Sequence, residues 1–231
     1  MAKPEADFVA IRTRVKFCGM TRLEDALAAA DAGADAVGFI FYAKSPRYIE
    51  PEKAGKIAEK LPPFVNRVGV FVDAALDEIE RTVTLARLTA VQLHGSESVE
   101  FCAGLRQRMP LLTLLKAFRV GETSSAADFV DYNDVVDAFL LDTFVKGEKG
   151  GTGHCFNWEL VQKLQLARPF FLAGGLNRGN VVPAMMQLGP YGLDLNSGVE
   201  SAPGVKIQQE IVRVMLIVRE VNREADDQAQ H

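Results

Sequence analysis

Short apolar segments alternate with amphipathic segments along most of the chain. The apolar segments are rich in β-branched and aromatic residues, and they predict buried strands at 15–18, 34–41, 66–72, 90–93, 111–118, 135–141, 169–173 and 191–196. Apolar residues at helical spacing predict helices at 23–32, 51–61, 75–87, from about 96, and at 124–133, 157–167, 178–187 and 206–221. The pattern therefore predicts eight consecutive strand–helix pairs.

Strands that are apolar throughout are typical of parallel sheets, because helices cover both faces of such a sheet. Eight units within roughly 210 residues favour a closed (β/α)₈ TIM barrel of the α/β class over an open doubly wound sheet. We expect one catalytic barrel domain at 14–221, an N-terminal tail at 1–13 and a C-terminal tail at 222–231, the last being polar enough to fray.

Nearly every predicted strand is followed by a polar residue or a glycine. These residues are Cys18, Ser45 with Arg47, Asp73, His94, Arg119, Asp142, Gly174 with Gly175, and Ser197 with Gly198. In TIM barrels the chemistry takes place at the carboxyl ends of the strands. The positions therefore predict a single site at one end of the barrel.

Three of the loops at that end are rich in glycine. They contain Gly151 and Gly153, Gly174 and Gly175, and Ser197 and Gly198. Glycines let backbone N–H groups approach an anion, and the loops after the seventh and eighth strands commonly bind phosphate in barrels. The alternative is that these glycines only allow tight turns. Their combination predicts a phosphate site.

Cys18 and Asp142 are candidates for proton transfer. Cys18 ends a strand at the mouth of the predicted barrel, whereas Cys102 and Cys155 are interpreted as small core residues. A thiol with an ordinary pKa of about 8.5 needs a pKa about 1–2 units lower to act as a base at neutral pH. A carboxyl acts as an acid there only if desolvation or a nearby negative charge raises its pKa, so we expect the two titrations to be coupled.

Arg47, His94 and Lys16 are further polar residues at or near strand ends. Arg47 lies in a loop stiffened by Pro46, where its guanidinium suits bidentate capture of a carboxylate; the alternative is a solvated surface arginine. The histidines lack the paired spacing of a metal site, so we expect no metal and a structural or peripheral role for His94. Lys16 precedes Cys18 by two residues and would share its face of the strand.

The composition narrows the function classes. A hydrophobic content of 48% with 24% charged residues is typical of a globular protein, and no apolar run approaches the ~18 residues of a membrane span. The first residues include acids and no continuous apolar region, so we expect a cytoplasmic protein. A net charge of −4 disfavours nucleic-acid binding, which leaves a small molecule as the expected partner.

Nine motifs occur in order between about residues 15 and 219. They are KFCGMT (16–21), FYAKSPRYI (41–49), VGVFV (68–72), QLHG (92–95), KAFRV (116–120), LLDT (140–143), GGTG (150–153), LAGGLN (172–177), and LNSGVE (195–200) with PG at 203–204. Together they resemble the phosphoribosylanthranilate isomerases of tryptophan biosynthesis. The resemblance covers all eight predicted units.

The resemblance implies a cofactor-free Amadori rearrangement of N-(5'-phosphoribosyl)anthranilate to 1-(2-carboxyphenylamino)-1-deoxyribulose 5-phosphate. Asp142 matches the general acid of that family, Cys18 its general base, and Arg47 the arginine that holds the anthranilate carboxylate. The glycine loops match its phosphate site. We expect a phosphosugar substrate, no nucleic-acid or membrane partner, and a monomer or homodimer. One departure is Ile207, which stands where the family often has an aspartate.

Two other functions are compatible with the same pattern. The aminoaldose isomerase of histidine biosynthesis performs the same rearrangement but would be expected to use two aspartates, so Cys18 argues against it; an enzyme that accepts both substrates is harder to exclude. The second is an inactive phosphate-binding sensor or scaffold, against which the joint presence of Cys18, Asp142 and Arg47 argues.

Overall fold

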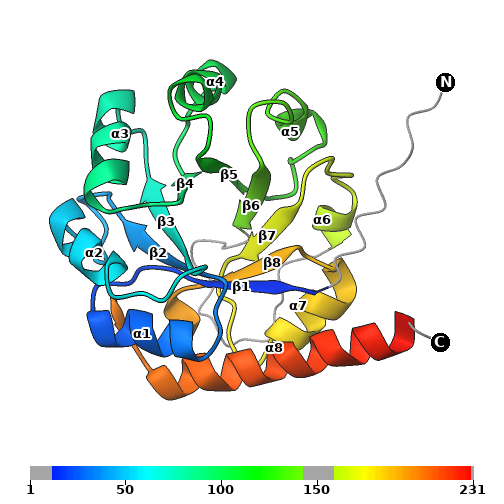
Figure 1. Ribbon diagram of the computed structural model, residues 1–231. Coiled ribbons are helices and arrows are strands. Elements are labelled where there is room, and N and C mark those ends of the chain that lie inside the picture. Colours follow the sequence, from blue (N-terminus) through cyan, green and yellow to red (C-terminus); the bar gives the residue numbers. More distant parts are fainter. Residues whose placement is uncertain (1–11, 143–158, 230–231) are drawn as a thin grey trace.

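The chain folds into a closed barrel of eight parallel strands surrounded by helices (Figure 1). The computed structural model describes residues 12–142 and 159–229. Strand order around the barrel follows the chain from β1 to β8, and β8 pairs with β1 in parallel from Arg14↔Gly192 to Phe17↔Leu195. The predicted TIM barrel is therefore confirmed.

The elements alternate as predicted. The barrel strands are β1 Arg14–Phe17, β2 Ala36–Ile40, β3 Asn66–Phe71, β4 Ala90–Leu93, β5 Thr113–Arg119, β6 Ala138–Asp142, β7 Phe170–Ala173 and β8 Gly192–Leu195. The helices are α1 Leu23–Asp31, α2 Pro51–Ala58, α3 Leu76–Leu85, α4 Val99–Arg108, α5 Ala127–Val130, α6 Glu159–Gln162, α7 Val181–Leu188 and α8 Gln208–Ala229.

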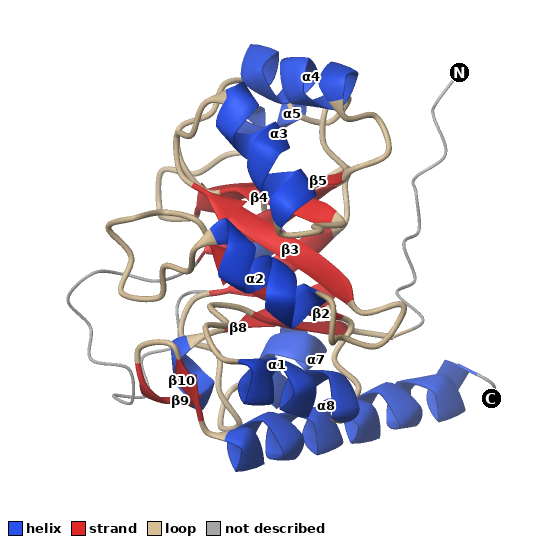
Figure 2. Ribbon diagram, turned by 60° about the vertical axis from the view of Figure 1, so that its left-hand side comes forward, coloured by secondary structure: helices blue, strands red, loops and turns tan. Residues whose placement is uncertain are grey.

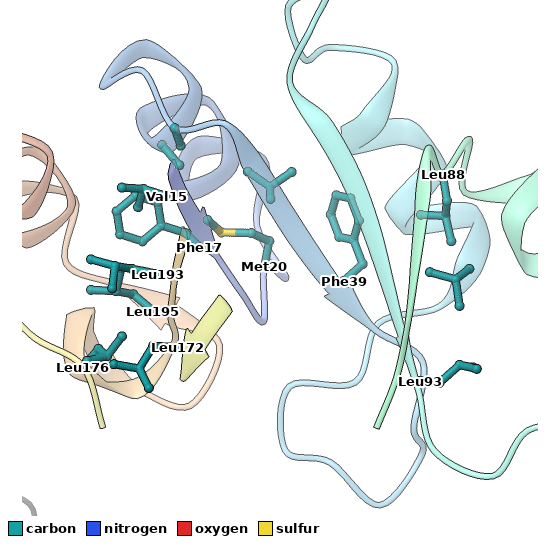
Figure 3. Close-up of a cluster of buried hydrophobic side chains, with 14 of the residues drawn as sticks. Val15, Phe17, Met20, Phe39, Leu88, Leu93, Leu172, Leu176, Leu193 and Leu195 are labelled. Atoms are coloured by element: carbon teal, nitrogen blue, oxygen red, sulfur yellow. The ribbon is translucent and has the colours of Figure 1, made fainter. Parts of the chain in front are cut away.

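Successive residues of each strand serve different layers of the molecule. Phe17 of β1 and Leu195 of β8 belong to the large core between the sheet and the helices, where Figure 3 shows them close to Leu172 of β7. Lys16 and Asp194 precede them by one residue and therefore point to the opposite face, into the barrel. A separate apolar cluster takes one residue from each of the strands β2 to β6, namely Ala36, Val68, Ala90, Leu115 and Ala138. It forms a layer inside the barrel, as is usual for this fold.

Helices α4, α5 and α6 differ from the predicted ranges. Helix α4 begins at Val99 because the Ser98 hydroxyl accepts a hydrogen bond from the Phe101 amide, which makes Ser98 the N-cap. Helix α5 contains four residues and is much shorter than 124–133. Helix α6 is described from Glu159 and ends at Gln162, before the predicted end at 167. Positive φ at Gln165 (45°) accompanies the early end of α6.

The C-terminal tail expected at 222–231 is wrong for its described part. Helix α8 continues to Ala229 and runs beneath α1 and α7 (Figure 1). Its last turns are rich in Glu, Arg, Gln and Ala, which have high helix propensity. The Asn222 side chain also bonds to Thr13: the Thr13 amide donates to Oδ1 over 2.8 Å, and Nδ2 donates to the Thr13 carbonyl over 3.0 Å.

A small excursion between β8 and α8 was not predicted. It comprises the 3₁₀ helix η1 (Ser197–Val199) and an antiparallel hairpin of β9 (Glu200–Ala202) and β10 (Val205–Lys206). Figure 2 shows this hairpin beside the start of α8. Among the described residues, no helix combines the length and apolar character that crossing a membrane requires.

Candidate active site

A cavity of about 420 Å³ opens at the carboxyl ends of the strands. Its lining comprises Cys18, Ile40, Arg47, Val70, Gln92, His94, Asp142, Ala173, Gly174, Gly175, Leu176, Asp194, Asn196, Ser197 and Gly198. Nine residues are predicted to act in catalysis or substrate binding, and the seven that the structure describes all line this cavity: Cys18, Arg47, Asp142, Gly174, Gly175, Ser197 and Gly198. The other two, Gly151 and Gly153, lie outside the described residues. Asp73 and Arg119 also follow strands but do not line this cavity.

Asp142, the last residue of β6, lies beside His94 in the wall of the cavity. Oδ2 of Asp142 lies 3.4 Å from Nε2 of His94, and Nδ1 of His94 lies 2.9 Å from the amide nitrogen of Gln92. The Gln92 amide group and the Asp142 carboxyl group therefore lie on opposite edges of the His94 ring. His94 therefore lines the cavity beside Asp142, and the structural or peripheral role expected for it stays a prediction.

Cys18 follows β1 and lies almost fully buried beside Lys16. Gly38 of β2 makes room for both side chains, because a Cβ atom there would come within 2.9 Å of the Cys18 sulfur and 3.1 Å of the Lys16 ammonium nitrogen. The Lys16 nitrogen also lies 2.8 Å from Oδ1 of Asp194. The three ionisable groups thus form one buried cluster, and Cys18 and Asp194 of this cluster line the cavity.

Burial raises the pKa of the Cys18 thiol above its ordinary value, although the Lys16 ammonium acts to lower it. The lower pKa that a base needs at neutral pH is therefore absent from Cys18 in the substrate-free protein. For Lys16, burial is the largest influence and lowers the pKa, but Asp194 and Cys18 together outweigh it and the pKa is raised. Lys16 is consequently a permanent cation next to a protonated thiol at neutral pH.

Arg47 reaches the cavity from the loop after β2, where it binds Glu200. Nε of Arg47 lies 3.0 Å from both carboxylate oxygens, and Nη2 lies 2.6 Å from Oε2. Oε1 of Glu200 also accepts from the Lys206 ammonium over 2.8 Å. Burial raises the pKa of Glu200, but hydrogen bonds from Arg47 and Lys206 outweigh it, so the pKa is lowered and the carboxylate stays ionised. Burial lowers the pKa of Lys206.

The glycine loops after β7 and β8 meet at one side of the cavity. Gly174 and Gly175 have backbone φ angles of 97° and 69°, a region that residues other than glycine rarely adopt. A Cβ atom on Gly198 would lie only 1.9 Å from the carbonyl oxygen of Leu176. The glycines therefore allow both the turn after β7 and the close approach of the two loops.

The sequence interpretation missed Gln92, Asp194, Glu200 and Lys206. Gln92 and Asp194 sit within strands, and only their polarity in otherwise apolar segments distinguishes them. Glu200 and Lys206 belong to the hairpin that the pattern did not predict. Gln92 is almost fully buried, and its Oε1 atom has no hydrogen-bond partner among the described residues.

Known proteins resemble the chain in both sequence and structure. A family model described as N-(5'phosphoribosyl)anthranilate (PRA) isomerase matches residues 15–216. The N-(5'-phosphoribosyl)anthranilate isomerase of Geobacter sp. strain M21 is 48% identical over 201 residues, which cover 87% of this chain and 95% of that protein. The enzyme of Crocosphaera subtropica is 43% identical over 209 residues, 90% of this chain and all of the relative.

The solved structures lead to the same family. The phosphoribosylanthranilate isomerase of Thermotoga maritima superposes with a TM-score of 0.79 at 41% identity, over 90% of this chain and 99% of the other; a further structure describes that enzyme as dimeric. A phosphoribosylanthranilate isomerase structure solved in complex with reduced 1-(o-carboxyphenylamino)-1-deoxyribulose 5-phosphate gives a TM-score of 0.77 at 39% identity, over 90% and 99% of the two chains. The chain belongs to the N-(5'-phosphoribosyl)anthranilate isomerase family.

Proposed function

We propose that Asp142 and Cys18 are the general acid and the general base of the reaction of this family. The chain is an isomerase of tryptophan biosynthesis that converts N-(5'-phosphoribosyl)anthranilate to 1-(2-carboxyphenylamino)-1-deoxyribulose 5-phosphate. The observation that carries the assignment is their shared cavity: β7 and β8 separate β6 from β1, so the two groups reach a substrate from different sides. An Amadori rearrangement needs one proton delivered and another removed at different atoms.

In the first step, Asp142 protonates the ring oxygen of the ribose while the bond from this oxygen to C1' breaks. The anthranilate nitrogen supplies the electron pair, and a cationic Schiff base forms. His94, whose Nε2 lies 3.4 Å from Asp142, holds the carboxyl group at the side of the cavity. Once the proton has been transferred, an imidazole N–H at this distance stabilises the resulting carboxylate.

In the second step, the Cys18 thiol first releases its own proton to solvent, and the resulting thiolate removes the proton from C2' of the Schiff base. The resulting enolamine tautomerises to the ketone product. The positive charge of the Schiff base acidifies this C–H bond and favours a thiolate beside it, since a nearby opposite charge stabilises the ionised form. The Lys16 ammonium acts in the same direction. The raised pKa of Cys18 therefore describes the protein before the intermediate forms.

The remaining predicted residues bind the two ends of the substrate. Arg47 binds the anthranilate carboxylate, and the loops with Gly174, Gly175 and Gly198 bind the phosphate together with Ser197. Gly151 and Gly153 complete the phosphate site in this proposal, although they lie outside the described residues. The cavity volume of about 420 Å³ suits a ligand of this size.

Turnover of freshly generated phosphoribosylanthranilate, followed by the loss of its fluorescence, tests the assignment. We expect Cys18→Ser and Asp142→Asn to lose about a hundredfold or more in kcat while still binding the reduced product analogue. Asp134→Asn, at an exposed position before β6, is the matched control. Retention of near-normal kcat in either variant would remove that residue from the mechanism, and an inactive wild type would move the function to a related phosphosugar.

We also infer a monomer or a homodimer in the cytoplasm. The Thermotoga maritima relative, described as dimeric, supports the second state. Light scattering of the purified chain measures the mass directly, and fractionation of the source cells tests the location.

A further inference from the structure

Arg47 is held in place before any substrate arrives. Its backbone amide donates to the Ser45 hydroxyl over 3.1 Å, which tightens the loop after β2. Its aliphatic stem lies over Gly19, where a Cβ atom would come within 2.8 Å of the Arg47 Cδ. The Arg47 side chain is only 19% exposed, so most of its conformational freedom is already lost.

Glu200 occupies one edge of the guanidinium group. The carboxylate binds the Nε and Nη2 atoms, which form the lateral edge of the planar group. A guanidinium has five N–H donors, and this arrangement uses two of them. The other edge, formed by Nη1 and the second N–H of Nη2, has no protein partner among the described residues, and Arg47 lines the cavity. A second carboxylate can therefore bind there in the same bidentate way.

Glu200 is itself fixed by buried groups. The Lys206 ammonium and the Gly204 amide both donate to its Oε1, over 2.8 and 3.1 Å, and the Lys206 side chain has no exposed surface. The hairpin that carries these residues is tied to the first βα unit, because the Lys206 amide donates to Asp25 Oδ2 over 3.0 Å. These bonds hold the Glu200 carboxylate in place independently of Arg47. The position of Glu200 therefore determines the orientation of the Arg47 guanidinium.

The charges of this cluster also favour an anion. Arg47 and Lys206 are cations and Glu200 is an anion, so the three groups together carry one positive charge in a largely buried setting. A bound carboxylate brings the sum to zero. A neutral group at the same place would leave the excess charge without a counterion, which is unfavourable where solvent is scarce.

From this geometry we infer that Glu200 is a positioning residue that sets the preference for a carboxylated aromatic amine by orienting Arg47. The inference rests on the proposed function, in which Arg47 binds the anthranilate carboxylate. Glu200 does not touch the reacting atoms. It binds one edge of the guanidinium and leaves the other edge to face the substrate. The enzyme thereby recognises the substrate through its carboxylate.

Two ligands separate this role from a merely structural one. The first is the reduced product analogue with its carboxylate, and the second is the same compound made from aniline, which lacks only that group. The ratio of their dissociation constants reports the carboxylate contact alone, because folding defects and phosphate binding affect both ligands equally. Calorimetry gives the ratio for the wild type, Glu200→Gln, Glu200→Asp and Arg47→Met. Glu220→Gln, which changes an exposed ion pair with Arg223 on α8, is the control.

We expect Glu200→Gln to lower the preference for the carboxylated ligand by about tenfold, the size of a lost or misaligned charged hydrogen bond. Glu200→Asp keeps the charge beside Lys206 but withdraws it from Arg47, so it should have a similar effect even if Glu200→Gln folds poorly. An unchanged ratio in Glu200→Asp, with the ratio abolished in Arg47→Met, would overturn the inference and leave the proposed function intact. If the wild type shows no preference, or Arg47→Met keeps it, the carboxylate assignment of Arg47 itself is wrong.

Discussion

At the scale of single residues, the cluster of Lys16, Cys18 and Asp194 decides how much thiolate the site contains. Burial raises the pKa of Cys18, and Lys16 acts against it. Replacing Lys16 by methionine removes this cation while keeping a long side chain. We therefore expect the pKa of Cys18 to rise further, and the ascending limb of kcat/KM against pH to move to higher pH. Each unit of displacement lowers kcat/KM at neutral pH about tenfold.

The controls for this prediction must distinguish the loss of the Lys16 charge from a loss of folding stability. Lys16→Met leaves Asp194 without its partner at 2.8 Å, and breaking a buried ion pair costs about 3–5 kcal/mol. Lys16→Arg retains the charge and should keep the limb closer to that of the wild type. Lys56→Met, on the exposed side of α2, changes the same residue type far from the barrel interior. Superimposable profiles for wild type and a folded Lys16→Met would show that Lys16 does not influence Cys18.

At the scale of elements, the contact between the loops after β7 and β8 is the feature most sensitive to substitution. A methyl group on Gly198 would lie 1.9 Å from the Leu176 carbonyl oxygen, so Gly198→Ala must push the loops apart. We expect at least roughly tenfold weaker inhibition by inorganic phosphate and a loss of about 1–3 kcal/mol in the free energy of unfolding, as is usual for overpacking. Inhibition assays and urea titrations measure the two effects.

Gly104 in α4 provides the matched substitution. A methyl group there would meet only Leu76 Cδ1, at 3.6 Å, an ordinary contact distance. Gly104→Ala should therefore raise the free energy of unfolding by about 0.5–1 kcal/mol through helix propensity and leave phosphate inhibition as it is. Equal phosphate inhibition in Gly198→Ala and wild type would mean that these loops do not bind the phosphate.

The elements also show why some features could be predicted and others could not. Strands apolar on both faces and glycines at their ends are local patterns, so the barrel, Cys18, Asp142 and the loop glycines were accessible from the sequence. The pairing of Arg47 with Glu200 joins residues 153 positions apart and depends on a hairpin that leaves no periodic signal. The contact between His94 and Asp142 could not be predicted either, because the two residues belong to different βα units.

At the scale of the whole molecule, the barrel is closed between the first and last strands, and α8 reinforces this seam. Because the hydrophobic pattern ends near residue 221, the sequence predicts a polar tail after it. The structure instead bonds the Asn222 amide group to both backbone polar groups of Thr13, just before β1, while the Thr13 hydroxyl donates to the Pro190 carbonyl just before β8. The three segments meet at the amino-terminal end of the barrel, opposite the cavity.

This arrangement predicts a loss of stability without a loss of catalysis. Asn222→Ala removes two hydrogen bonds to a partly buried backbone, so we expect a decrease of about 1–3 kcal/mol in the free energy of unfolding and an unchanged kcat. Asn222→Asp keeps the acceptor for the Thr13 amide but loses the donor, so its decrease should be smaller. Removal of residues 222–231 should cost at least as much as Asn222→Ala. Urea unfolding followed by circular dichroism gives these values, and a truncated chain as stable as the full one would restore the view of this segment as a dispensable tail.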